Sequence, residues 1–396
     1  MPEVRRQLPY GTVALVLQGG GALGAYQAGV YEGLEEAGIV PDWVAGISIG
    51  AFNSAIIAGN PPGERCQRLR EFWETICRPA YSQPPADLLQ HWIEGLGGEA
   101  RKLFGAFQAW RVVLEGQRGF FTPRLPPPWL TVEMPPVRAS YYDNSQLKST
   151  LENLADFDRI NAGETRVSVS AVNVRTGNFE HFDNRAGRWK GRLRPEHFMA
   201  SGALPPGFPP VEIEGEYYWD GGLVSNTPLL RVLQAWPRPD ILAFQVDLWS
   251  ALGVVPTNIW DVHERQKDIQ FSSRTRAITD LMHREQRLRH LIRELLQRIP
   301  DERRREACCA EARLWATDRL VNVIHLIYRD KEWDGLAKDY AFDPLSMHEH
   351  WASGLEDIRH SLGHGEWLEP PGDGRNFVTH DLHRHRHRGG EAARGD

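Results

Sequence analysis

One serine stands in a pattern that would make it reactive. Residues 46–50 read Gly-Ile-Ser-Ile-Gly, the G-x-S-x-G motif, between a short apolar run expected to be a strand and a small-residue stretch expected to be a helix. In that context Ser48 sits on a sharp strand-to-helix turn, exposed for attack on a carbonyl carbon. Gly46 and Gly50 have a steric reason, because a Cβ at either position would collide with the flanking strand and helix. We therefore expect Ser48 to be a nucleophile.

A glycine-rich loop precedes this motif. Residues 18–24 read Gln-Gly-Gly-Gly-Ala-Leu-Gly, directly after the apolar run of residues 13–17. A dinucleotide fingerprint needs an acidic residue at the end of the next strand, whereas Asp42 stands before that strand. In acyl transfer, backbone N–H groups at a helix start stabilise the charge that develops on the carbonyl oxygen. The loop therefore favours an oxyanion hole, and nucleotide binding is the weaker alternative.

A serine nucleophile needs a base. Asp220 follows a predicted strand, and Gly221 and Gly222 allow close approach of the backbone, although Asp-Gly-Gly alone is more typical of a plain turn. In an α/β-hydrolase a histidine would come after the acid. Four histidines satisfy that order, but no flanking motif marks any of them, and each is more typical of a surface or core position: His263, His283, His290 and His325.

Four blocks in a fixed order resemble the patatin-like phospholipases, serine acyl hydrolases with a Ser-Asp dyad. The blocks are GGGALG with AYQAGV, GISIG with AFNSA, ASGALPPGFPPV, and DGGLVSNTP, and they cover about the first two-thirds of the chain. The resemblance implies that Ser48 is the nucleophile and Asp220 the proton acceptor. It also implies an oxyanion hole at Gly19, Gly20, Gly21 and Ala22. The motif glycines that it implies are Gly46, Gly50, Gly221 and Gly222. One departure is Leu23, where family members often carry Arg or Lys, so a positive charge near the loop is missing.

The resemblance implies a lipid ester substrate, such as a glycerophospholipid. Free aspartate has a pKa near 4 and is a weak base, so we expect apolar walls such as Trp219 to raise the pKa of Asp220 and activity to fall at acid pH. The alternative is a patatin-fold lipid-binding or scaffold protein with little turnover, which Leu23 favours and the intact dyad opposes. We expect no metal and no cofactor, because no His, Cys and carboxylate cluster has ligand spacing.

The elements that must position these residues follow an α/β pattern. Strands are expected at 13–17 and 43–47, each followed by a helix, as in a sheet with parallel strands. Gly29 and Gly33 weaken the first helix in isolation, so we infer close packing there. With the resemblance, the pattern predicts a three-layer α/β/α fold with a mostly parallel central sheet.

Four regions are expected. Residues 1–250 form the catalytic core, with an insertion at about 60–140 rich in proline and aromatic residues, including Trp92, that could host an acyl chain or act as a lid. Residues 251–318 form a charged helical insertion, 319–370 a strand and helix that pack on the core, and 371–396 a disordered tail.

The charged insertion is expected to hold one long helix at about 260–299. Its narrow apolar stripe lies opposite a face dominated by arginine. Such a helix packs on the core or on a second subunit, and the latter would make the protein a homodimer. The alternative is that the helix contacts a membrane surface.

Composition bounds the remaining possibilities. The chain has 396 residues and a mild net charge of -6, which argues against nucleic-acid binding. Its four cysteines form no C-x-x-C pair, and the N-terminal apolar run is too short for a signal peptide or a membrane span. We therefore expect a cytoplasmic protein, with peripheral membrane contact as a further option.

Overall fold

The structure is a computed structural model that describes residues 5–78, 98–130, 133–235, 239–273, 275–316, 319–329, 331, 338–372 and 375–381. Among these residues, nine strands form one sheet in the order β11-β10-β9-β1-β2-β5-β8-β7, with β6 paired to β5. Their bounds are Thr12–Leu17 (β1), Trp43–Gly46 (β2), Arg166–Asn173 (β5), Phe179–Asp183 (β6), Val211–Ile213 (β7), Glu216–Asp220 (β8), Ile241–Asp247 (β9), Val321–Ile327 (β10) and Phe377–Asp381 (β11). Two short strands, Thr122–Pro123 (β3) and Tyr142–Asp143 (β4), pair separately.

The strands from β11 to β5 run parallel, and β6, β7 and β8 run antiparallel to their neighbours. Strands β1 and β2 are almost entirely apolar because they are covered on both faces. Ala14, Leu15, Val16 and Leu17, for example, are all completely buried. The carboxyl ends of β1 and β2 lead into the glycine-rich loop and the serine motif, so the sheet brings both motifs to one edge.

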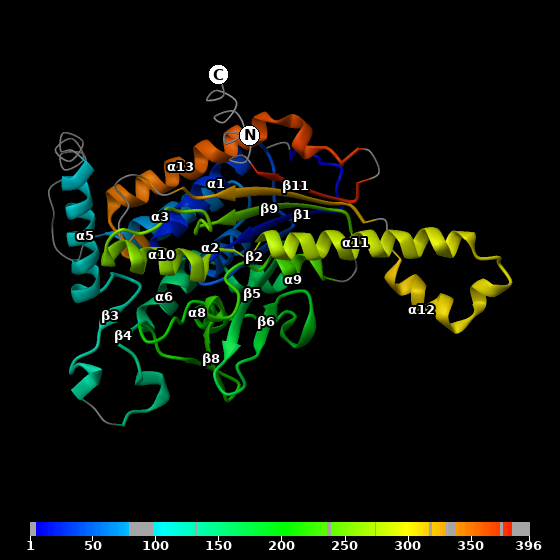
Figure 1. Ribbon diagram of the computed structural model, residues 1–396. Helices are drawn as coiled ribbons and strands as arrows, with labels where there is room; N and C mark the ends of the chain where they lie inside the picture. The colour runs from blue at the N-terminus through cyan, green and yellow to red at the C-terminus, as the bar shows by residue number, and fades with distance from the viewer. Residues whose placement is uncertain are drawn as a thin grey trace, which may run out of the picture.

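Helices cover both faces of the sheet (Figure 1). The described helices are Ala25–Glu36 (α1), Ile49–Ala58 (α2), Arg65–Cys77 (α3), Gly98–Glu115 (α5), Ser145–Leu154 (α6), Phe157–Ala162 (α7), Pro195–Ser201 (α8), Leu229–Leu233 (α9), Ile259–Phe271 (α10), Thr275–Arg298 (α11), Ala307–Trp315 (α12) and Pro344–Gly363 (α13). One hydrophobic cluster joins β1 to α1, α3 and α13, and a second joins the opposite side of β1 to α9 and α11. The predicted three-layer fold with a mostly parallel sheet is confirmed.

The glycines of α1 allow close contact with α13. A Cβ on Gly29 would lie 1.9 Å from the carbonyl oxygen of Trp351, and a Cβ on Gly33 would lie 2.3 Å from Ile358. A Cβ on Gly354 of α13 would in turn lie 2.0 Å from the Tyr26 carbonyl. The close packing inferred from Gly29 and Gly33 is therefore confirmed.

The helix expected at 260–299 is two helices, α10 and α11. The break follows Phe271, whose carbonyl oxygen accepts hydrogen bonds from Nε2 of Gln18 at 3.1 Å and Nδ2 of Asn226 at 2.9 Å. Because side chains satisfy this carbonyl, the helix can end there. The prediction of one continuous helix was wrong because both capping residues are distant in the sequence.

Two other expectations meet the described residues only in part. Phe377–Asp381 forms β11, paired with β10, so the disordered tail predicted from residue 371 is corrected at this segment. The rest of that prediction, residues 382–396, lies outside the described residues, as does Trp92. In the same aromatic insertion, α5 contacts the β3 segment.

Candidate active site

Ser48 occupies the turn between β2 and α2 with a φ of 55°, a strained conformation for a residue that is not glycine. A Cβ on Gly46 would lie 2.2 Å from the Gly50 carbonyl, and a Cβ on Gly50 would lie 2.5 Å from the Leu17 carbonyl. Both glycines therefore have the steric role predicted for them. The Ser48 amide donates to the carbonyl oxygen of Ser201 at 3.1 Å, which anchors the turn from the end of α8.

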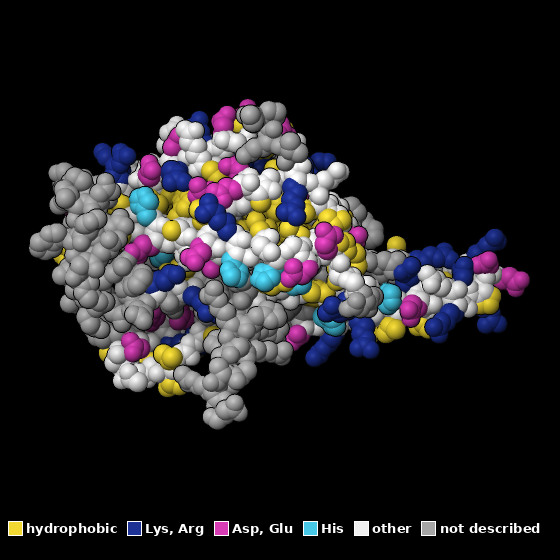
Figure 2. Space-filling model, turned by 90° about the horizontal axis from the view of Figure 1, so that it is seen from above, with side chains coloured by type: hydrophobic (Ala, Val, Ile, Leu, Met, Phe, Trp, Pro, Cys, Tyr) yellow, Lys and Arg dark blue, Asp and Glu magenta, His cyan; other side chains and the backbone are white. Residues whose placement is uncertain are grey.

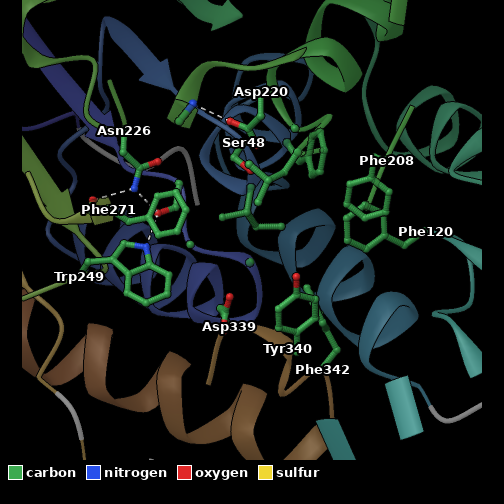
Figure 3. A pocket seen from close by; sticks show the side chains of 18 of the residues that line it. Ser48, Phe120, Phe208, Asp220, Asn226, Trp249, Phe271, Asp339, Tyr340 and Phe342 are labelled. Atoms are coloured by element: carbon green, nitrogen blue, oxygen red, sulfur yellow. Dashed lines mark hydrogen bonds between the residues drawn. The ribbon is translucent and has the colours of Figure 1, made fainter. Parts of the chain in front are cut away.

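Asp220 ends β8 and lies beside Ser48, with the two side chains facing each other (Figure 3). Its backbone amide donates to the Ala203 carbonyl at 3.0 Å, and its carboxylate accepts a hydrogen bond from the Gly222 amide at 2.7 Å. Burial raises its pKa to about 7, while hydrogen bonds from the Gly222 amide and the Ser48 side chain act in the lowering direction. Asp220 can therefore hold or release a proton near neutral pH.

A cavity of about 90 Å³ opens beside the dyad. Eight aromatic side chains line it: Phe52, Phe120, Phe121, Phe208, Trp249, Phe271, Tyr340 and Phe342. Phe120 and Phe121 come from the aromatic insertion. Trp219, expected as a wall of the site, does not line the cavity, because successive residues of a strand point to opposite faces.

The glycine-rich loop borders this cavity at Gly19, Gly20 and Gly21. The loop enters a short 3-10 helix, Gly21–Gly24 (η1), ahead of α1. Within the described residues, the amides of Gly20, Gly21 and Ala22 donate no hydrogen bond. The Gly19 amide differs, because it donates to the Asn226 carbonyl at 3.2 Å. The Gly19 amide, expected as a donor to the oxyanion, is therefore already engaged in the fold.

A segment far along the chain closes over the loop. Lys338–Tyr340 (η7) places the Asp339 carbonyl 2.3 Å from where a Cβ on Gly21 would lie, and Gly21 itself has a φ of 56°. Only glycine satisfies both constraints. Two reciprocal ion pairs tie η7 to α10, joining Lys267 to Asp339 at 2.8 Å and Lys338 to Asp268 at 2.8 Å.

The alternative base residues lie elsewhere. None of His263, His283, His290 and His325 lines the cavity, and His325 is paired with Asp247 at 2.6 Å. Asp42, weighed as a ribose ligand, accepts from the Val13 amide at the start of β1, at the opposite edge of the sheet. Leu23 is completely buried in the hydrophobic core.

Three residues around the dyad were missed by sequence reasoning: Ser201, Asn226 and Trp249. Ser201 and Asn226 lie within the ASGALPPGFPPV and DGGLVSNTP blocks, so the motifs themselves were a signal. Trp249 follows β9 without any motif, and only the fold brings it to the loop.

Two features are absent from the described residues, a metal-binding cluster and a membrane-spanning helix. They contain no group of three or more His, Cys, Asp or Glu side chains arranged to hold a metal ion. They also contain no helix that is both long and apolar enough to cross a bilayer.

Family comparisons cover most of the site. A family model described as patatin-like phospholipase matches residues 15–233, more than half of the chain, which includes Ser48 and Asp220. A second model, described as patatin phospholipase, matches residues 269–374.

Individual relatives match shorter segments. Patatin-like phospholipase domain-containing protein 6 of Mus musculus is 48% identical over 75 residues, 19% of this chain and 6% of that protein. Lysophospholipase nte1 of Aspergillus terreus is 57% identical over 56 residues, 14% of this chain and 4% of that protein. The chain thus spans a small part of these curated relatives. The crystal structure of VipD from Legionella pneumophila has a TM-score of 0.37 at 14% identity, over 89% of this chain and 67% of that one, a likeness too weak to support an argument.

Proposed function

The chain belongs to the patatin-like phospholipase family, and from that premise we propose that it is a lipid acyl hydrolase with a Ser48-Asp220 dyad. The observation that carries the proposal is a carboxyl group with a pKa of about 7 beside a serine in a strained turn, at the wall of an aromatic cavity. A lipid ester fits the apolar lining, and the name of the Aspergillus relative favours a phospholipid or lysophospholipid.

The mechanism uses these groups in two half-reactions. Oγ of Ser48 attacks the ester carbonyl carbon while its proton passes to the Asp220 carboxylate. Amides of Gly20, Gly21 and Ala22 donate to the oxygen on which charge develops. The alcohol leaves with the proton from Asp220, and an acyl-serine remains. Water then attacks the acyl-serine, gives its proton to Asp220, and the acid is released as Ser48 recovers its proton.

The test compares wild type with Ser48→Ala and Asp220→Asn, using p-nitrophenyl butyrate and a fluorophosphonate probe. We expect each variant to lose on the order of 10⁴-fold in kcat, as when a nucleophile or its base is removed. Wild-type kcat/KM should halve near pH 7 and fall further with acidity, because protonated Asp220 cannot accept the serine proton. An Asp220→Asn variant with wild-type turnover would remove Asp220 from the mechanism.

The alternative is a lipid-binding protein that keeps this fold without turnover. It predicts a folded wild type that neither reacts with the probe nor hydrolyses the ester. The burial of Leu23 weakens the one sequence feature in its favour, because that side chain points into the core. A residue at this position therefore packs the loop against the core.

We further propose that α11 contacts a membrane surface. Four of its leucines, the leucine face, are exposed to solvent at 43–61%: Leu281, Leu288, Leu291 and Leu295. Met282, Gln286 and Arg289 on another side of the helix are buried. Arg284 lies seven residues before Leu291, and Arg298 lies seven residues after it. Because seven residues are about two helical turns, both arginines lie at the leucine face. Arginines at that position oppose pairing with a second copy and favour anionic lipid.

A further inference from the structure

The carbonyl oxygen of Gly19 accepts two side-chain hydrogen bonds. Nε1 of Trp249 and Nδ2 of Asn226 both donate to it, each at 2.9 Å (Figure 3). The carbonyl and the next N–H of a trans peptide point in opposite directions. The Gly19 carbonyl is held on the side of Trp249 and Asn226, so the Gly20 N–H points to the other side. Among the described residues, this amide donates no hydrogen bond.

We propose that Trp249 is a positioning residue of the oxyanion loop. Its indole N–H holds the Gly19–Gly20 peptide in the orientation in which the Gly20 amide can donate to the developing oxyanion. Trp249 thus acts through Gly20 and does not itself donate to the reacting oxygen. The inference rests on the proposed hydrolase function and adds a residue that lies outside the sequence motifs.

The loop needs such a restraint because of its composition. Three consecutive glycines adopt positive and negative φ with similar ease, so rotation of the Gly19–Gly20 peptide is cheap. A rotated peptide would turn its carbonyl dipole toward the oxyanion and oppose the reaction. Two donors on the Gly19 carbonyl disfavour that rotation in advance of substrate binding.

Trp249 is itself rigidly held. Its side chain is only 3% exposed, and its ring packs against Phe271 with centroids 5.5 Å apart. The ammonium group of Lys338 lies 5.3 Å from the ring, and the backbone amide of Trp249 donates to Oε1 of Gln18 at 3.0 Å. A donor fixed by its surroundings costs little reorganisation during the reaction.

Asn226 contributes to the same carbonyl but has other contacts. Its own carbonyl accepts from the Gly19 amide, and its Nδ2 also donates to the Phe271 carbonyl at 2.9 Å. Replacing the Asn226 side chain would therefore disturb two contacts at once. Removing the indole N–H of Trp249 disturbs one, which makes it the cleaner test.

The experiment measures hydrolysis of p-nitrophenyl butyrate by Trp249→Phe. We expect kcat to fall about tenfold, which is less than the loss expected for an oxyanion donor itself. KM should stay within about twofold of the wild-type value. The pH limb of Asp220, the fall in activity as that residue is protonated, should stay at the same pH. Trp43→Phe is the matched control, because Trp43 is also 3% exposed and its Nε1 donates to Ser168 at 2.9 Å. This control should keep wild-type kcat.

A second replacement guards against misfolding of Trp249→Phe. Replacing Trp249 by 3-benzothienylalanine exchanges the N–H for sulfur within the same ring outline, so the packing is kept while the donor is lost. The same fall in kcat is expected. Full kcat in this variant, or a shifted pH limb, would overturn the positioning role. A wild type that neither labels nor hydrolyses would instead overturn the proposed function.

Discussion

At the residue scale, the buried carboxyl of Asp220 has a cost in stability. Burial raises its pKa from 3.8 to about 7 in the folded protein, whereas the unfolded chain ionises near pH 4. Between these values the folded state binds more protons than the unfolded state, so the free energy of unfolding falls as the pH rises. Above about pH 7 the penalty is constant, and it is at most about 4 kcal/mol.

Asp220→Asn should therefore stabilise the protein in a pH-dependent way. The gain in Tm over wild type should be near zero at pH 4, grow up to about pH 7 and stay constant above it, because asparagine does not ionise. Thermal unfolding at intervals from pH 4 to 8 measures this. Asp183→Asn is a control of opposite sign, because it leaves Arg166 and Arg231 without their buried partner. A gain independent of pH would contradict the raised pKa.

Single residues also show what the sequence could reveal. Ser48 and Asp220 could be found because each stands in a local motif whose glycines have a steric reason. Trp249 could not, because its partner Gly19 is 230 positions away. Trp219 was expected as a wall of the site from its position next to Asp220, yet strand alternation turns neighbours apart.

At the element scale, α10 and η7 form a strap over the glycine-rich loop. The two elements exchange charges reciprocally, Lys267 with Asp339 and Asp268 with Lys338. The second pair is almost fully buried, and the first is partly exposed. Because η7 presses the Asp339 carbonyl against Gly21, we infer that these pairs keep the loop in place.

Exchanging the charges of the more exposed pair tests this strap. Lys267→Asp and Asp339→Lys should each lower kcat on p-nitrophenyl butyrate, because like charges then face each other across α10 and η7. The double variant restores opposite charges at this pair and should recover most of the loss, with a coupling of about 1 kcal/mol. Arg359→Asp, which breaks an exposed pair with Glu36, should leave kcat unchanged. Additive losses would show that the pair does not hold η7.

The elements also explain which parts of the fold were predictable. The opening strands and helices follow apolar periodicity and glycine breaks, so their positions agree with the structure. The break between α10 and α11 depends on the side chains of Gln18, from the glycine-rich loop, and Asn226, from the Asp220 segment. The helical periodicity of residues 260–299 therefore does not predict the break. Likewise β11 is a strand because β10 provides an edge for it.

At the scale of the whole molecule, α11 and α12 form an arm that projects beyond the sheet (Figure 1), and Lys and Arg side chains gather along it (Figure 2). Residues 275–316 carry ten arginines against seven acidic residues, although the chain has a net charge of -6. The arm is thus a local cationic surface that also exposes the leucine face. Both features favour contact with an anionic bilayer.

We expect the protein to bind vesicles rich in phosphatidylglycerol more tightly than phosphatidylcholine vesicles, and we expect binding to weaken with salt.

Arg284→Gln with Arg287→Gln should lower binding roughly 30-fold, at about 1 kcal/mol for each arginine. Lys190→Gln with Arg138→Gln, which removes equal charge from exposed sites elsewhere, should change it little. Leu288→Ser with Leu295→Ser should weaken binding, whereas Leu252→Ser with Val255→Ser, more exposed but off the arm, should not. Co-sedimentation measures all five proteins, and sedimentation velocity decides the competing case. A dimer dissolved by the leucine changes, or equal binding to both vesicle types, would assign the leucine face to something other than anionic lipid.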